Sequence, residues 1–138
     1  MGNPDVGTHL ADLAGISAES LIKKLGSFGP FGLAINAERQ RVLVSKSDDG
    51  QSLLTLETVP LQLRAAAAKE RLLATAVIAF LPIASSANAP AQDTIVIQIE
   101  VPGADVVVMG RTVKKGLFGY KFGEPFIIAQ PIAERVFA

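Results

Sequence analysis

The residues able to carry out acid–base, nucleophilic or metal chemistry are few in this sequence. His9 is the only histidine among 138 residues, and there is no cysteine. A catalytic triad or a Cys-His pair would have to use His9, and no serine occupies a G-x-S-x-G turn. Metal binding would depend on carboxylates, yet the adjacent Asp48 and Asp49 lack the alternating ligand spacing of a calcium loop. We predict no catalytic residue, no metal site and no cofactor.

Paired carboxylates are the remaining route to catalysis, because 13 acidic residues are scattered along the chain. Glu57 and Glu100 each interrupt an otherwise apolar stretch. In a predicted strand at 94–101, Glu100 shares a face with Gln98, and this polar face should meet solvent or a partner. A strand carboxylate that faces water is the commoner situation. The sequence therefore favours a protein that is not an enzyme, and whether any carboxylate pair forms a site stays open.

Basic and aromatic residues are interleaved between residues 111 and 126, RTVKKGLFGYKFGEPF. This combination can follow a phosphate backbone and stack bases. However, KKGLFGYKF breaks the spacing of the RNP1 signature of RNA-recognition motifs, and a net charge of zero gives no long-range attraction to nucleic acid. Nucleic-acid binding is thus the weaker alternative, and its candidate residues are Arg111, Lys114, Lys115, Tyr120 and Lys121.

Phe-Gly pairs occur in two separate regions, at 28–29 and 31–32 and again at 118–119 and 122–123. Phe buries a large apolar area, while Gly lets another backbone approach closely. The two regions could pack together within one chain, which is the commoner arrangement, or they could meet between copies. In the second case the oligomer interface would contain Phe28, Phe31, Phe118 and Phe122, joined by Ile132, Val136 and Phe137 of an extended C-terminal arm at 131–138.

The elements that must position these residues are organised around residues 64–81, RAAAAKERLLATAVIAFL. Strong helix formers dominate the stretch, and neither Gly nor Pro occurs before Pro82. From residue 72 to residue 81 only Thr75 is not apolar, and a helix that is apolar all round must be buried. We predict one long buried helix, whose apolar part is too short to span a bilayer. If this helix lines a cavity for a lipid-like ligand, the lining residues would be Leu73, Val77, Phe80 and Leu81.

The N-terminal segment, residues 1–26, predicts two short helices, at 8–14 and 18–25. The second has two lysines in its last turn and Gly26 where a C-cap belongs.

Strands are predicted on both sides of the long helix. Residues 31–59 predict a β-meander whose third strand lies at 52–59, and residues 94–130 predict a second β segment with its clearest strand at 94–101. The fold class is therefore α+β: a mainly antiparallel sheet of about seven strands in meander order, packed around one long buried helix, with short N-terminal helices. The length fits a single domain, 1–138.

Composition guides the functional expectation. Apolar residues make up 49% of the chain and charged residues only 19%, against about a quarter in typical globular domains. We expect copies to shield one another, as in a self-assembling structural or interaction protein that forms a homo-oligomeric ring, shell or filament. The alternative is a carrier of an apolar, lipid-like ligand, or a membrane-active protein that uses the apolar helix. No N-terminal signal peptide is predicted, which favours the cytoplasm or a particle. The host, the compartment, the oligomer symmetry and any bound ligand stay open.

Overall fold

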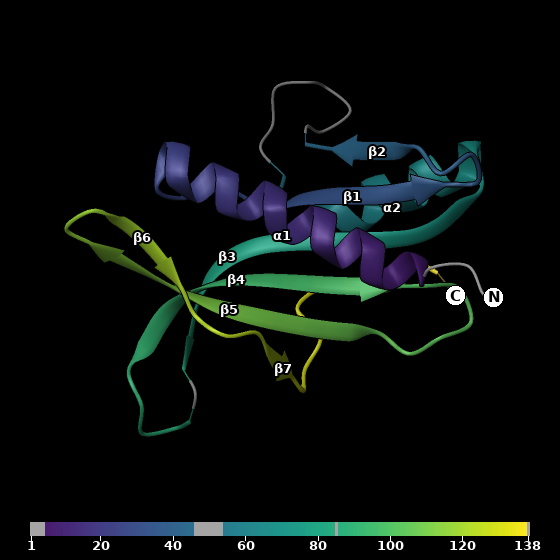
Figure 1. The fold of residues 1–138 in the computed structure, drawn as a ribbon. Helices are drawn as coiled ribbons and strands as arrows, with labels where there is room; N and C mark the ends of the chain where they lie inside the picture. The colour runs from purple at the N-terminus through teal and green to yellow at the C-terminus, as the bar shows by residue number, and fades with distance from the viewer. Residues whose placement is uncertain (1–4, 46–53, 85, 138) are drawn as a thin grey trace.

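The computed structural model describes residues 5–45, 54–84 and 86–137. Within these ranges the chain forms two helices and seven strands (Figure 1). Their bounds are α1 Val6–Leu25, β1 Phe31–Asn36, β2 Arg41–Val44, α2 Thr58–Lys69, β3 Leu72–Ala84, β4 Ala91–Glu100, β5 Val107–Gly116, β6 Gly119–Phe122 and β7 Phe126–Ile128.

The strands form an antiparallel sheet in the order β2-β1-β3-β4-β5-β6, with β7 paired to β5. The predicted α+β class with a mainly antiparallel sheet of about seven strands is therefore confirmed. The predicted meander order is wrong in its first half, because β1 lies between β2 and β3. After the β1–β2 hairpin the chain crosses over through α2 and returns as β3 on the other side of β1.

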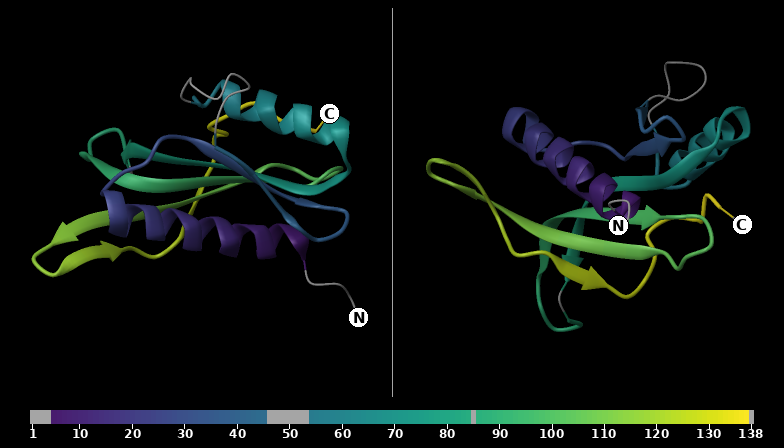
Figure 2. Two further views of the ribbon diagram at one scale, coloured as in Figure 1. Left: turned by 90° about the horizontal axis from the view of Figure 1, so that it is seen from above. Right: turned by 45° about the vertical axis from the view of Figure 1, so that its right-hand side comes forward.

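The helices cover opposite faces of the sheet, so the molecule has three layers (Figure 2, left). α1 packs on β1, β3 and β4, whereas α2 packs on β1, β2 and β3 from the other side. β3 serves both apolar cores because its side chains alternate. Ala76 and Ile78 belong to the core under α1, and Val77 belongs to the core under α2.

The predicted long buried helix at 64–81 is wrong. Helix α2 ends at Lys69, and Leu72–Ala84 forms β3 in the middle of the sheet. A strand covered on both faces carries a continuous apolar run, so it lacks the alternation by which strands are recognised. The Ala-rich start of the stretch belongs to α2, and the β-branched pair Val77 and Ile78 comes only later.

Helix α1 is continuous, so the prediction of two short helices at 8–14 and 18–25 is wrong. Asp5 caps the first turn with a side-chain hydrogen bond, and Gly26 ends the helix in the left-handed conformation at φ 81°. The fully buried stripe that holds α1 to the sheet repeats every fourth residue: Leu10, Ala14, Ala18 and Ile22. Burial of this stripe offsets the cost of Gly15 within the helix, about 1 kcal/mol relative to Ala.

The third strand predicted at 52–59 is wrong in the part that the structure describes. Residues 54–57 are not in a strand, and α2 begins at Thr58. Pro60, which looked like the end of a strand, lies in the first turn of α2, where its missing N–H is not needed. Residues 46–53, which include Asp48 and Asp49, lie outside the described residues.

The polar face of β4 holds the C-terminal segment, residues 131–137, which lies beside α2 (Figure 2, left). Gln98 Oε1 accepts from the backbone N–H of Ile132 at 2.7 Å. Glu100 accepts from the N–H groups of Val136 and Phe137, each at 2.7 Å. The face expected to meet solvent or a partner therefore meets the chain's own last residues.

Candidate functional site

The residues first considered for catalysis do not come together. His9 is exposed on α1, and Glu57 is exposed just before α2. Glu100 is only 2% exposed, and both of its carboxylate oxygens bind the C-terminal segment. Among the described residues no group of three or more His, Asp or Glu side chains could hold a metal ion. Asp48 and Asp49 lie outside the described residues.

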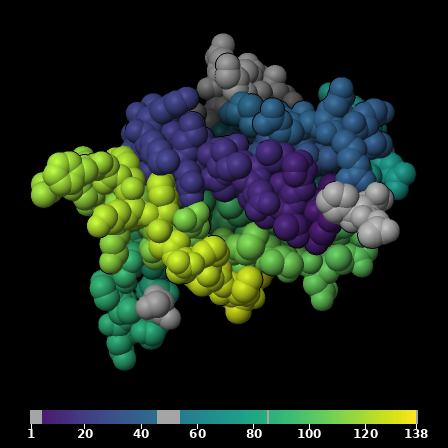
Figure 3. Space-filling view, viewed as in Figure 1, coloured from purple at the N-terminus to yellow at the C-terminus, as the bar shows by residue number. Residues whose placement is uncertain are grey.

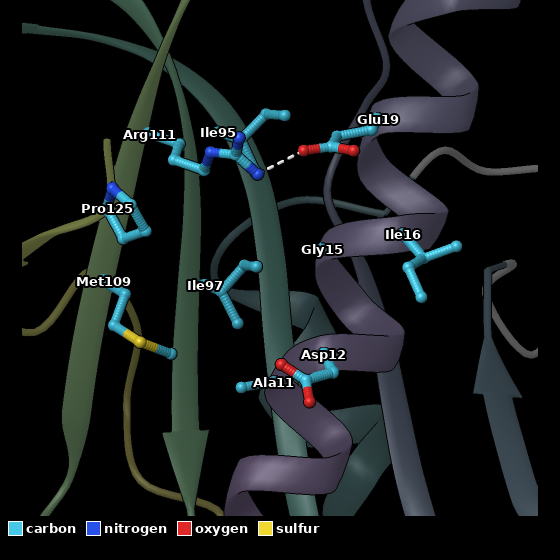
Figure 4. A pocket seen from close by; sticks show the side chains of 11 residues that line it. Ala11, Asp12, Gly15, Ile16, Glu19, Ile95, Ile97, Met109, Arg111 and Pro125 are labelled. Carbon is cyan, nitrogen blue, oxygen red and sulfur yellow. Dashed lines mark hydrogen bonds and ion pairs between the residues drawn. The ribbon is translucent and has the colours of Figure 1, made fainter. Parts of the chain in front are cut away.

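A groove of about 410 Å³ opens between α1 and the β4–β5 part of the sheet (Figure 4). It exists because α1 crosses β1, β3 and β4 and leaves β5 uncovered. Its apolar lining includes Ala11, Gly15 and Ile16 from the helix, Ile95, Ile97, Met109 and Gly110 from the sheet, and Pro125.

The strand register explains the floor of this groove. Ile97 lies opposite Met109, and Ile95 lies opposite Arg111, so all four side chains point toward α1. The helix wall is low because Gly15 has no side chain there. A Cβ added to Gly15 would meet nothing within 4 Å, which means that the groove is open at this point.

Charged side chains form the rim. Arg111 donates from Nη1 to Glu19 Oε1 and from Nε to the carbonyl of Gly123 at 2.7 Å, so it joins α1 to the segment after β6. The guanidinium also lies 5.7 Å from the centre of the Phe122 ring. Asp12, about two turns before Glu19 on the same helix, is exposed at the other end of the rim. The groove thus has an apolar floor, and two carboxylates and one guanidinium lie at its edge.

The second feature is the β5–β6 hairpin, which projects from the body as a lobe of its own (Figure 3). Leu117 and Phe118, here called the tip, form its two-residue turn and are 95% and 104% exposed. Gly119 has φ 127°, which favours glycine and allows the chain to reverse. Two adjacent large apolar side chains in full contact with water form an exposed apolar patch, and such patches are frequent at binding sites.

The two faces of the hairpin differ. Tyr120 and Phe122 point toward α1 and are half-buried against its apolar core. On the opposite face Lys114 lies directly across from Lys121, and both are exposed. Lys115, opposite Tyr120, is the residue nearest the tip that carries a charge. Three lysines therefore lie directly behind the tip on the two strands, and they are here called the lysine collar: Lys114, Lys115 and Lys121.

Most of the predicted oligomer-interface residues pack against other parts of their own chain. The ring of Phe28 lies 5.5 Å from that of Phe31 and 5.7 Å from that of Phe80, and both Phe28 and Phe122 pack against the core under α1. Val136 is buried in the core under α2. Three further residues of the predicted interface are half-buried against one of the two cores: Phe122, Ile132 and Phe137. Only Phe118 of the predicted set is exposed.

The predicted apolar-ligand lining is not assembled. It relied on a helix, and all four residues belong to strand β3. Leu73 and Phe80 pack toward the α1 core, whereas Val77 points to the opposite core. Leu81 lies half-buried further along β3, and none of the four lines the groove.

The nucleic-acid candidates are divided between different roles. Arg111 is engaged by Glu19, and Tyr120 packs toward α1. Lys114, Lys115 and Lys121 remain exposed on the hairpin. Sequence reasoning found these lysines and Phe118, but it missed the groove, because nothing in a sequence relates Gly15 to Met109. The glycine within a helical pattern was the one available signal.

No family model, no curated protein and no solved structure matches this chain. Neither helix in the described part of the chain is long and apolar enough to cross a membrane.

Proposed function

We propose that the protein is a self-assembling interaction protein in which the tip of one copy enters the groove of the next. The observation that carries this proposal is the full exposure of Leu117 and Phe118 at the end of a projecting hairpin. Removing each side chain from water would contribute about 1.5–3 kcal/mol. Nothing in residues 5–45, 54–84 and 86–137 covers the tip, whereas a second copy offers it an apolar groove.

Tip and groove agree in size and charge. A volume of about 410 Å³ lies within the range of sites that enclose small apolar groups, roughly 300–1,000 Å³. The rim of the groove carries Asp12 and the Glu19–Arg111 ion pair, so it is negative on balance, and the tip is followed by Lys114, Lys115 and Lys121. Opposite charges around an apolar centre orient two partners and suppress wrong pairings.

Such a contact would be heterologous, because tip and groove are different surfaces of the same chain. A heterologous contact repeats from copy to copy, so it closes into a ring or grows into a filament. A symmetric dimer, in which one patch meets itself, is not favoured by this arrangement. The proposal therefore keeps the homo-oligomer expected from composition and moves its interface to Phe118 and the groove.

Two variants that each remove one surface test the proposal. Leu117→Ser/Phe118→Ser, the tip variant, removes the apolar tip, and Gly15→Phe, the groove variant, fills the groove from the helix wall. In light scattering after size exclusion we expect the wild-type mass to rise with concentration and each variant to stay monomeric. A mixture of the two variants should form a dimer and nothing larger, because only one intact tip and one intact groove remain per pair.

Leu43→Ser is the matched control, since it removes another leucine that is 62% exposed, on β2, and it should assemble like the wild type. The proposal fails if the wild-type protein remains monomeric at high micromolar concentration, or if both variants assemble as it does. Native mass spectra in which every copy carries an apolar small molecule, lost in Gly15→Phe, would instead assign the groove to an apolar-ligand carrier.

A further inference from the structure

The lysine collar carries more positive charge than the groove rim of another copy can balance, because the rim carboxylates Asp12 and Glu19 share that edge with Arg111. Lys114 and Lys121 face each other across neighbouring strands, and like charges in this position repel. Neither makes an ion pair with any residue in the described ranges. A pair of this kind is tolerated most easily where an anionic partner lies against it.

More positive charge lies at the same end of the molecule. The last turn of α1 carries Lys23 and Lys24, and the Lys23 ammonium lies 5.8 Å from the centre of the Phe122 ring in β6. Leu25, at the end of this helix, is itself 69% exposed. Glu124 is the acid nearest to β6 in the chain, two residues beyond its end. This end of the molecule thus combines five lysines with exposed apolar side chains.

The spacing within the hairpin fits a bilayer surface. At about 3.3 Å per strand residue, Lys115 lies roughly 7 Å and the Lys114–Lys121 pair roughly 10 Å behind the two turn residues. Apolar groups of peripheral proteins enter the boundary between headgroups and acyl chains by about 5–10 Å. With the tip at that depth, the lysine side chains reach the lipid phosphates, because their flexible stems extend toward the polar layer.

The same residues fit a nucleic acid less well. Sequence-tolerant binding of single strands needs several exposed aromatic rings on which bases stack. Tyr120 and Phe122 are half-buried toward α1, which leaves Phe118 as the exposed aromatic ring of the hairpin. Its neighbour Leu117 offers apolar area that a base does not need but an acyl layer does.

We infer that the β5–β6 hairpin is a docking site for an anionic lipid bilayer, with Leu117 and Phe118 inserted and Lys114, Lys115 and Lys121 at the phosphates. This site goes beyond assembly and does not require it. Apolar insertion and a basic cluster are the two signals that together give stable membrane attachment. A tip inserted in a bilayer cannot occupy the groove of another copy, so lipid binding and assembly compete for it.

A unique fluorophore tests insertion directly, because the sequence contains no tryptophan. In Phe118→Trp we expect a blue shift and increased intensity on addition of phosphatidylserine–phosphatidylcholine vesicles, and no change with phosphatidylcholine alone. Leu43→Trp, exposed on the far edge strand β2, is the control and should not respond to either. An unchanged spectrum of Phe118→Trp with both kinds of vesicle would overturn the inference.

Co-sedimentation with the same vesicles separates the contributions of charge and insertion. Both Lys114→Gln/Lys121→Gln and the tip variant should bind at least tenfold more weakly than the wild type. Lys69→Gln/Arg71→Gln removes two exposed charges at and just after the end of α2 and should bind normally. Raising the salt concentration from 0.1 M to 1 M shortens the screening length from about 10 Å to about 3 Å and should release the wild-type protein.

The groove variant distinguishes this inference from the proposed assembly. Gly15→Phe should bind vesicles at least as well as the wild type even though it no longer assembles. If it assembles normally but binds vesicles, the proposed function fails and the lipid site stands. If the wild-type protein binds single-stranded oligonucleotides and not anionic vesicles, and Lys114→Gln/Lys121→Gln loses that binding, the lipid inference is overturned in favour of nucleic acid.

Discussion

The two faces of the sheet are closed by different chemistry. On the α2 face, Gln98 and Glu100 hold the C-terminal segment by hydrogen bonds, and the segment lies beside α2. On the α1 face the helix packs through an apolar stripe, and among the described residues the Glu19–Arg111 pair is the ion pair that reaches across toward β5. Both faces keep an opening, which on the α2 face is a cleft of about 1060 Å³ between α2, β5 and the C-terminal segment. The difference lies in what holds each face: directional hydrogen bonds on one and mainly apolar contacts on the other.

The two carboxylates show what this difference means energetically. The side chain of Glu100 is 2% exposed, and that of Glu19 is 25% exposed. A buried carboxylate that accepts backbone hydrogen bonds contributes strongly, because its partners would otherwise be left unsatisfied. An ion pair that water reaches contributes much less. We therefore expect the α2 face to carry stability and the α1 rim to remain adaptable.

The largest effect is expected for Glu100→Gln. One oxygen becomes an NH₂ group that faces the N–H of Phe137 or Val136, so donor meets donor in a buried place. We expect the free energy of unfolding to fall by about 2 kcal/mol. Urea unfolding with an unchanged slope measures this. Glu38→Gln, at an exposed residue, is the control, and a loss no larger than the control's would show that the C-terminal segment does not stabilise this face.

An intermediate effect of opposite sign is expected at the groove. Gly15→Ala adds a methyl group that meets open space and improves helix propensity, so the free energy of unfolding should rise by about 1 kcal/mol. Thermal unfolding followed by circular dichroism measures the change. Gly7→Ala is the comparison, because its Cβ would lie 3.2 Å from a Val101 methyl and should gain less. A destabilised Gly15→Ala would mean that the groove is closed in solution.

The smallest effect is expected for Glu19→Gln, which makes at the rim the same change as Glu100→Gln. Since water reaches this ion pair, we expect a loss of about 0.5 kcal/mol. The same urea titrations compare the two variants directly. Equal losses for Glu19→Gln and Glu100→Gln would remove the distinction between the faces.

Local signals in the sequence predicted part of this fold correctly. The strand at 94–101 forms most of β4, and Gly26 ends α1 because its cap chemistry depends on neighbouring residues alone. The stretch at 64–81 does not show its strand in the sequence, because burial on both faces removes the alternation of apolar and polar residues. Whether such an apolar run becomes helix or strand depends on β1 and β4, which lie far away in the chain.

The sequence predicted only those parts of the candidate site that a single residue or residue pair defines. Phe118 was among the predicted interface residues, because a Phe-Gly pair is visible in the sequence. The groove depends on the register of Ile97 with Met109 and on the line that α1 takes across the sheet. Gln98 and Glu100 looked like a solvent-facing pair, since their partners are backbone N–H groups, which no sequence pattern identifies.

The alternation of side chains along β3 has a practical consequence for watching this molecule in solution. Ile78 and Val77 are neighbours in the chain, yet their methyl groups lie in separate cores. Methyl resonances from these two positions would act as paired reporters, one for each layer. A structural change that begins at the groove and one that begins at the C-terminal segment can therefore be distinguished by comparing the methyl signals of these two adjacent residues.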